Sequence, residues 1–105
     1  MSEEFLQAKS EELIKELNDV ITQLATLRAE HKSIEEAIDR LEKLEDINEV
    51  FEKVGVVYIK RDREAVIVEL KAVREALNTT IKSLEKKEKD LRETLNRILS
   101  STQGS

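Results

Sequence analysis

The chain has 105 residues, with 39% charged, 39% hydrophobic and 3% aromatic residues, two glycines, and no proline or cysteine. This length allows one domain at most, and the composition is typical of long helices or a coiled coil. The lack of cysteine excludes a disulfide framework, a thiolate nucleophile and a zinc site built on sulfur. Because no signal peptide or long apolar run is recognisable, we expect a soluble cytoplasmic protein that does not bind membranes.

The net charge of −5 is unevenly distributed along the chain. Residues 1–52 carry 15 acidic and 6 basic side chains, whereas residues 53–105 carry 8 acidic and 12 basic ones. Two helical arms lying side by side would therefore attract each other. This pattern favours a helical hairpin that closes on itself over a basic arm that binds nucleic acid.

The first helix is predicted to span about residues 3–46. Ser2 can cap its start, and Glu3 and Glu4 follow in the first turn, where the helix dipole favours acids. Apolar residues then recur in steps of three and four, which is typical of a coiled-coil seam. The seam consists of Leu6, Leu13, Leu17, Val20, Leu24, Leu27, Ile34, Ile38 and Leu41.

His31, the single histidine, occupies the seam position between Leu27 and Ile34. No cysteine, second histidine or suitable serine accompanies it, so we interpret it as a polar residue that sets the register rather than as a catalytic or metal-binding residue. Pairing of the two arms about Gly55 would place His31 opposite Thr79 and Thr80.

Residues 47–61 change to an alternating pattern and predict a β-hairpin over about residues 49–61, with its turn at Gly55. A two-stranded hairpin is marginally stable in water, and this one carries apolar residues on both faces. We therefore expect hairpins from several chains to join edge to edge. The simpler alternative is a local clip that only turns the chain.

The second helix is predicted over about residues 63–99, capped by Asp62, and the polar tail 100–105 is expected to be disordered. Two successive steps of four, from Val73 to Leu77 to Ile81, predict a stutter that locally unwinds the supercoil. The seam consists of Val66, Leu70, Val73, Leu77, Ile81, Leu84, Leu91, Leu95 and Ile98.

Near the two chain ends, apolar residues occur as adjacent pairs, or doublets, such as Leu13 with Ile14. Only one residue of each doublet can face a two-helix seam. We expect Phe5, Ile14, Ile21 and Leu99 to remain partly exposed. Such a surface can receive a third helix, make an incidental contact or bind apolar partners, and the plain alternative is a widened seam.

No glycine-rich phosphate loop, nucleophile and base pair, metal-ligand spacing or aromatic stacking platform occurs in the sequence. We therefore expect no enzymatic activity and no cofactor, and any function must depend on binding.

Several features follow one another in a fixed order: a heptad arm, the aromatic Phe51 ahead of Val54-Gly55, the apolar strand 56–59 and a return arm with LEKKE at residues 84–88. Over roughly residues 10–99 this order resembles the β-class subunit of prefoldin, of the archaeal type. About 15 residues separate the arms, which leaves room for one hairpin, whereas the α class of that family has two. The sequence departs from the family at Lys87, where many relatives have glutamine, and at Phe51, which is frequently tyrosine.

The resemblance implies a mainly helical fold: a long antiparallel two-helix coiled coil, joined by a single β-hairpin that assembles into an intersubunit β-barrel. It also implies an ATP-independent chaperone of two α and four β subunits that holds unfolded client proteins and delivers them to a group II chaperonin. Assembly would involve Val50, Phe51, Val54, Val56, Val57, Tyr58 and Ile59. Client contact would involve Phe5, Leu6, Leu13, Ile14, Leu95, Ile98 and Leu99.

Two other functions are consistent with parts of the sequence. A structural coiled-coil adaptor would use the same hairpin for assembly and bind one folded partner at a fixed site. A nucleic-acid binder fits less well, because the chain is acidic and its basic arm faces an acidic one.

Overall fold

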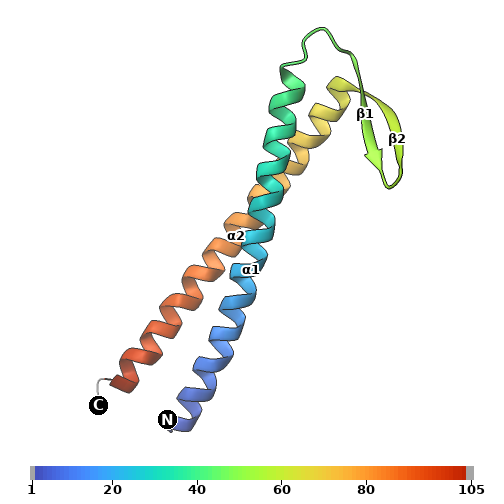
Figure 1. Cartoon of the computed structure of the whole chain (residues 1–105). Coiled ribbons are helices and arrows are strands. Elements are labelled where there is room, and N and C mark those ends of the chain that lie inside the picture. The colour runs from blue at the N-terminus through green and yellow to red at the C-terminus, as the bar shows by residue number, and fades with distance from the viewer. Residues whose placement is uncertain (1, 104–105) are drawn as a thin grey trace. The chain divides into compact units, whose positions relative to one another are not determined.

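The computed structural model describes residues 2–103, which form two long helices and a β-hairpin (Figure 1). The elements are α1 (Glu3–Glu42), β1 (Glu49–Val54), β2 (Val57–Asp62) and α2 (Arg63–Gln103). The predicted fold, two long helices joined by a single hairpin, is thus confirmed. The chain divides into a terminal unit, which extends up to Arg28 and from Thr80 onward, and a hairpin unit, Ala29–Thr79.

Both helices begin at the predicted N-caps. The hydroxyl Oγ of Ser2 accepts a hydrogen bond from the backbone N–H of Phe5 (3.1 Å). The carboxylate of Asp62 accepts one from the backbone N–H of Ala65 (2.9 Å). Each cap satisfies an N–H that has no partner within its own helix.

Helix α1 ends at Glu42, earlier than the predicted residue 46. The N–H of Leu44 turns back to the carbonyl of Leu41 (3.2 Å), which tightens the last turn. Glu45 and Asp46 follow, and a helix that continued through them would carry two acids at its negative end.

Helix α2 extends to Gln103, beyond the predicted end at residue 99. Residues 100–103, which the sequence predicted to be disordered, are therefore helical. Polar side chains do not end a helix by themselves, and the first helix-breaking residue is Gly104. Residues 104 and 105, the rest of the predicted tail, lie outside the described residues.

The core of the terminal unit joins the early part of α1 to the late part of α2, so the two helices pair antiparallel there. Leu24 and Val20 are its most deeply buried side chains, with 1% and 2% exposure. The buried cluster comprises Leu13, Leu17, Val20, Leu24, Ile81 and Leu91, and Leu27, Leu84, Leu95 and Ile98 pack against it.

The seam of α2 keeps its heptad spacing without a stutter. Val73, predicted to lie in the seam, is 44% exposed, whereas the neighbouring Arg74 is half-buried. The seam therefore advances by four residues from Leu70 to Arg74 and by three from Arg74 to Leu77, as in a regular coil. The predicted stutter is wrong. An arginine can occupy such a position because its aliphatic stem covers apolar surface while its charged end reaches water.

His31 is a half-buried seam residue, as predicted, but its surroundings differ from the prediction. In the hairpin unit it lines a hollow with Glu35, Arg74, Glu75 and Asn78. Thr79, one of the two predicted partners, is exposed and donates its hydroxyl to the Glu75 carbonyl (3.1 Å). The arms do not pair about Gly55, because residues 43–48 separate α1 from β1 while β2 runs directly into α2.

The hairpin closes through a two-residue turn, since Val54 pairs with Val57 across it. Gly55, the first turn residue, has a φ of 60°, and no other described residue has a positive φ. A glycine in this position is typical of a type II′ turn, whose twist matches that of the flanking strands.

Replacing Gly55 with alanine is expected to destabilise the hairpin by about 1 kcal/mol, because an L-residue is strained at this φ. A Cβ added at Gly55 meets no atom within 4 Å, so the effect would come from the backbone alone. Hydrogen exchange of the strand amides would measure it as a several-fold loss of protection. Val56→Ala, at a turn residue that is 96% exposed, serves as the control and should leave protection unchanged.

Candidate functional site

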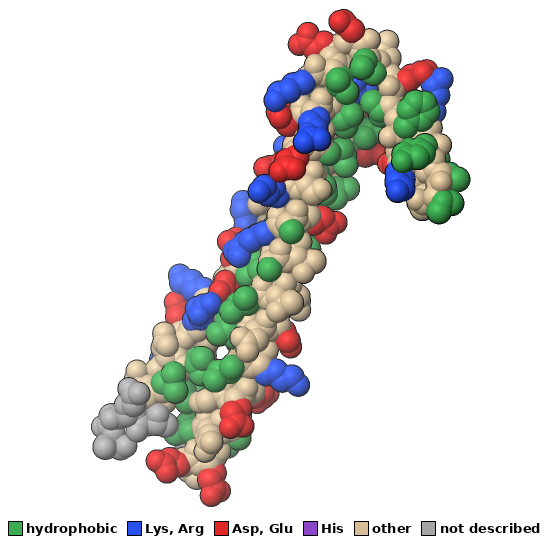
Figure 2. All heavy atoms as spheres, in the orientation of Figure 1, with side chains coloured by type: hydrophobic (Ala, Val, Ile, Leu, Met, Phe, Trp, Pro, Cys, Tyr) green, Lys and Arg blue, Asp and Glu red, His purple; other side chains and the backbone are tan. Residues whose placement is uncertain are grey.

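The hairpin presents an exposed apolar surface, which we call the hairpin patch (Figure 2). Phe51 and Tyr58 on the two strands are 69% and 67% exposed. The hairpin patch comprises Phe51, Val54, Val56, Val57, Tyr58 and Ile59. Val50, the seventh residue predicted for assembly, is half-buried. Apolar side chains this exposed on neighbouring strands indicate a protein-binding surface.

One face of the hairpin is tied to α2 through Arg61. Its guanidinium donates to the carboxylate of Glu69 on α2 and to that of Glu52 on β1 (3.5 Å). The hydrogen bond and the charge of Glu69 raise the pKa of Arg61 above its usual value, and Glu52 contributes less. These contacts orient the hairpin within its unit while the patch residues stay exposed.

Arg63 joins the end of α1 to the base of the hairpin, a role that we did not predict from the sequence. Its guanidinium donates to the carbonyl of Leu41 in the last turn of α1 (2.7 Å), and its backbone N–H donates to the carbonyl of Asn48 (2.8 Å). A cation in the first turn of a helix interacts unfavourably with the helix dipole. The position of Arg63 in that turn was therefore the feature of the sequence that could have indicated its role.

A groove of about 360 Å³ runs along β1 within the hairpin unit. Val66 and Leu70 of α2 contribute apolar surface, and Arg40 of α1 contributes a cation. The complete lining comprises Ala37, Arg40, Leu41, Val50, Phe51, Glu52, Val66 and Leu70.

The second candidate surface lies in the terminal unit and consists of the apolar residues that the seam does not cover. Phe5, Ile14, Ile21 and Leu99 are between 38% and 54% exposed, which confirms that they are partly exposed. Of the other residues predicted to contact clients, Leu6, Leu95 and Ile98 are half-buried. Leu13 is buried in the core, so it is not accessible to a partner while the coil is closed.

Near the helix ends this surface includes a hollow of about 440 Å³. Leu6 and Leu99 supply its apolar part, and Glu3 and Glu4 line it as well. The terminal unit therefore offers an apolar recess with acidic residues beside it.

Ion pairs link the two arms in both units. Glu16 pairs with Lys87 (3.4 Å) and Glu42 pairs with Lys71 (2.9 Å), so the acid lies on α1 in both. The pair of Arg28 with Glu85 (3.0 Å) has the opposite polarity. All of these side chains are about half exposed, so each pair contributes only ~0–1 kcal/mol, and the apolar seam is the main source of stability.

Further exposed apolar residues in the hairpin unit were not singled out from the sequence. Leu44 and Ile47 lie in the segment between α1 and β1, and Val68 lies on α2 with 66% exposure. Val68 follows the buried pair Val66 and Ile67, and a run of three apolar residues in a helix must turn one of them outward.

Among the described residues, no group of three or more acidic, histidine or cysteine side chains is placed to hold a metal ion. No helix in residues 2–103 combines the length and apolar character that a membrane span requires.

A two-stranded sheet with exposed apolar residues between two long helices is typical of coiled-coil proteins that pair with other chains through exposed strands. Comparisons with known proteins identify the family. The model of the prefoldin subunit family matches residues 4–103. Prefoldin subunit beta of Archaeoglobus fulgidus is 36% identical over 88 residues, which cover 84% of this chain and 76% of that protein.

A second relative and a solved structure agree. Prefoldin subunit beta of Thermococcus kodakarensis is 29% identical over 91 residues, which cover 87% of this chain and 78% of that protein. The crystal structure of the prefoldin beta subunit from Thermococcus strain KS-1 matches with a TM-score of 0.88 and 27% identity, covering 96% of this chain and 89% of that one. The chain belongs to the prefoldin family of chaperones, in its β-subunit class.

Proposed function

We propose that the chain is a holdase subunit that assembles through its hairpin and captures unfolded polypeptides on the apolar surface of its terminal unit. In this proposal four such chains join two α-class prefoldin subunits in the cytoplasm, and their hairpins form a shared β-barrel. The complex works without ATP or any cofactor and passes its clients to a group II chaperonin.

The assembly part of the proposal rests on the hairpin. Within the described residues the sheet has two strands, so each strand has one edge without a strand partner. Edges of this kind, flanked by exposed Phe51 and Tyr58, favour pairing with another chain. Arg61 and Arg63 fix the hairpin to the helices, so it is presented in a defined orientation.

The observation that carries the capture part is the exposure of Phe5, Ile14, Ile21 and Leu99 on a unit whose seam is already filled. Single exposed residues bind weakly. Several subunits in one complex would raise the effective concentration of such contacts, so that affinity arises without a deep pocket. Weak contacts at many points suit clients that have no fixed shape.

The test measures suppression of aggregation of a chemically unfolded enzyme by the complex with α-class subunits. The double variant Phe5→Ser/Leu99→Ser is expected to require about tenfold more complex for equal suppression of aggregation, because each chain loses two exposed apolar side chains. Val68→Ser/Val73→Ser is the matched control, because these residues are at least 44% exposed but lie on the hairpin unit.

Unchanged suppression by the terminal-unit variant, with intact assembly, would show that clients bind elsewhere. A complex that binds one folded partner but ignores unrelated unfolded enzymes would instead support the adaptor function.

A further inference from the structure

The outer edge of β1 has a chemical pattern that the outer edge of β2 lacks. The N–H of Arg63 bonds to the carbonyl of Asn48, so these two residues form a hydrogen-bonded pair at the base of the hairpin. Such pairs alternate along an antiparallel ladder. From the strand register, the backbone groups of Glu49, Phe51 and Lys53 therefore point outward from β1.

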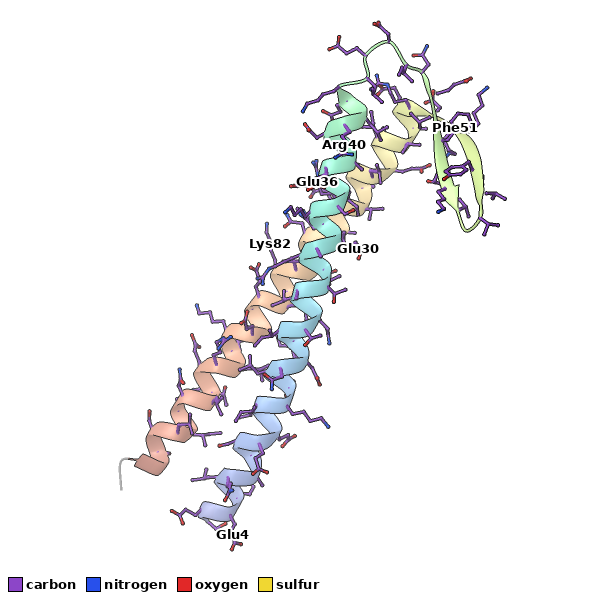
Figure 3. All side chains as sticks on the ribbon, in the orientation of Figure 1. Glu4, Glu30, Glu36, Arg40, Phe51 and Lys82 are labelled. Atoms are coloured by element: carbon purple, nitrogen blue, oxygen red, sulfur yellow. The ribbon has the colours of Figure 1, made fainter. Side chains whose placement is uncertain are left out.

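The side chains of these three residues share one face of the hairpin, and all are exposed (Figure 3 shows Phe51 on β1). Their order along the strand is acid, aromatic, base. Glu49 forms an ion pair with Lys60 on β2 (2.8 Å). Lys53 has no ion pair within the described part of the chain.

We infer that β1 pairs antiparallel with β1 of a second copy of this chain, with Phe51 opposite its counterpart. Glu49 of each copy then lies opposite Lys53 of the other, so both charged positions meet an opposite charge. Directly opposed side chains on such a pair have Cβ atoms ~4.5–5.5 Å apart, within reach of an ion pair. The contact uses the same strand on both copies, as a two-fold dimer requires.

The edge of β2 does not allow the same arrangement. Its outward residues are Tyr58, Lys60 and Asp62, and a two-fold pairing about the middle one would place Lys60 against Lys60. Asp62 is also engaged as the cap of α2. Like charges directly opposite each other destabilise a sheet, so β1 is the edge that suits a second copy.

The groove along β1 borders the position of the incoming strand. An antiparallel pair has its two-fold axis perpendicular to the sheet, so the second copy presents the face with Val50, Glu52 and Val54 on the side of the groove. Val66 and Leu70 of the first chain supply apolar surface there, and Arg40 offers a cation to the incoming Glu52. The second copy thus meets matching chemistry on its inner face as well.

This inference rests on the assembly role proposed above, and charge reversal in the isolated chain tests it. E49K places a lysine opposite Lys53, and K53E places a glutamate opposite Glu49. Each variant is therefore expected to self-associate at least about tenfold more weakly than the wild type. An equimolar mixture of the two variants restores opposite charges at both positions. We expect the mixture to dimerise although neither variant does so alone, with sedimentation equilibrium as the measurement.

Circular dichroism of each variant checks that its helices are intact. The inference is overturned if the wild-type chain stays monomeric, if the single variants associate as well as the wild type, or if the mixture fails to associate. Dependence on Glu49 without dependence on Lys53 also overturns it and would indicate pairing of β1 with β2 of the other copy.

Adding an α-class prefoldin subunit separates this inference from the proposed function. If the wild-type chain does not self-associate but still forms a complex that suppresses aggregation, only the β1 pairing is wrong. If the complex forms but does not suppress aggregation, the proposed function is wrong. The pairing of the two β1 strands is then decided by the sedimentation result alone.

Discussion

Replacing Phe51 and Tyr58 together with aspartate is expected to abolish assembly with α-class subunits while both helices remain folded. The two rings are the largest exposed apolar groups of the hairpin patch, and they contribute little to the fold of a single chain. A joined sheet would bury them, and burying a large apolar side chain contributes ~1.5–3 kcal/mol. Aspartate forfeits this energy and adds a charge that must be desolvated in the interface.

Size-exclusion chromatography with mass detection would show the variant and the α-class subunit eluting separately. Val68→Asp is a well-matched control, because Val68 is 66% exposed, close to Tyr58 at 67%, and belongs to the same unit. Valine and aspartate also have similar helix propensities. Assembly that survives in the hairpin variant, or fails equally in the control, would contradict a role specific to the hairpin.

Local patterns predicted much of the fold because they depend on residues close together in the chain. The caps at Ser2 and Asp62 and the turn at Gly55 each follow from the chemistry of one or two side chains, and the structure confirms them. The change of apolar spacing from a heptad to an alternating pattern likewise located the hairpin. The exposed doublet residues followed from counting how many apolar side chains a two-helix seam can bury.

The errors occurred where the outcome depends on the other arm. Val73 was placed in the seam because it is apolar, but the regular heptad turns it outward and brings in Arg74. The partners of His31 were wrong because the lengths of the connections on either side of the hairpin, and not the position of Gly55, set the register. Arg63 was missed because its partner, the carbonyl of Leu41, is a backbone group that no sequence pattern marks.

The assignment of client contacts shows the same division. Leu13 and Ile14 form one doublet. The heptad spacing assigns Leu13 to the seam and leaves Ile14 partly exposed, although the family resemblance implies client contact for both. The structure buries Leu13 and leaves Ile14 exposed. A side chain in the seam stabilises the coil, whereas its neighbour on the surface is available to a partner, so adjacent residues of similar chemistry have separate functions.

A comparison of Leu24 with Ile21 tests this separation in the terminal unit. Leu24→Ala is expected to lower the free energy of unfolding by about 3 kcal/mol, because it removes a fully buried side chain from the core cluster and leaves a cavity. Thermal unfolding should show a fall in Tm of roughly 10–20 °C for a chain of this size. Ile21→Ala, at a residue that is 38% exposed, is expected to lower stability by less than about 1 kcal/mol.

The two variants should exchange their ranking when client capture is measured instead. Well below its Tm, Leu24→Ala keeps the exposed surface and should suppress aggregation as the wild type does, whereas Ile21→Ala loses part of that surface. A similar loss of stability in both variants would contradict the seam register of α1. A loss of capture in Leu24→Ala at a temperature where its helices are intact would show that capture requires the closed core and not the exposed residues alone.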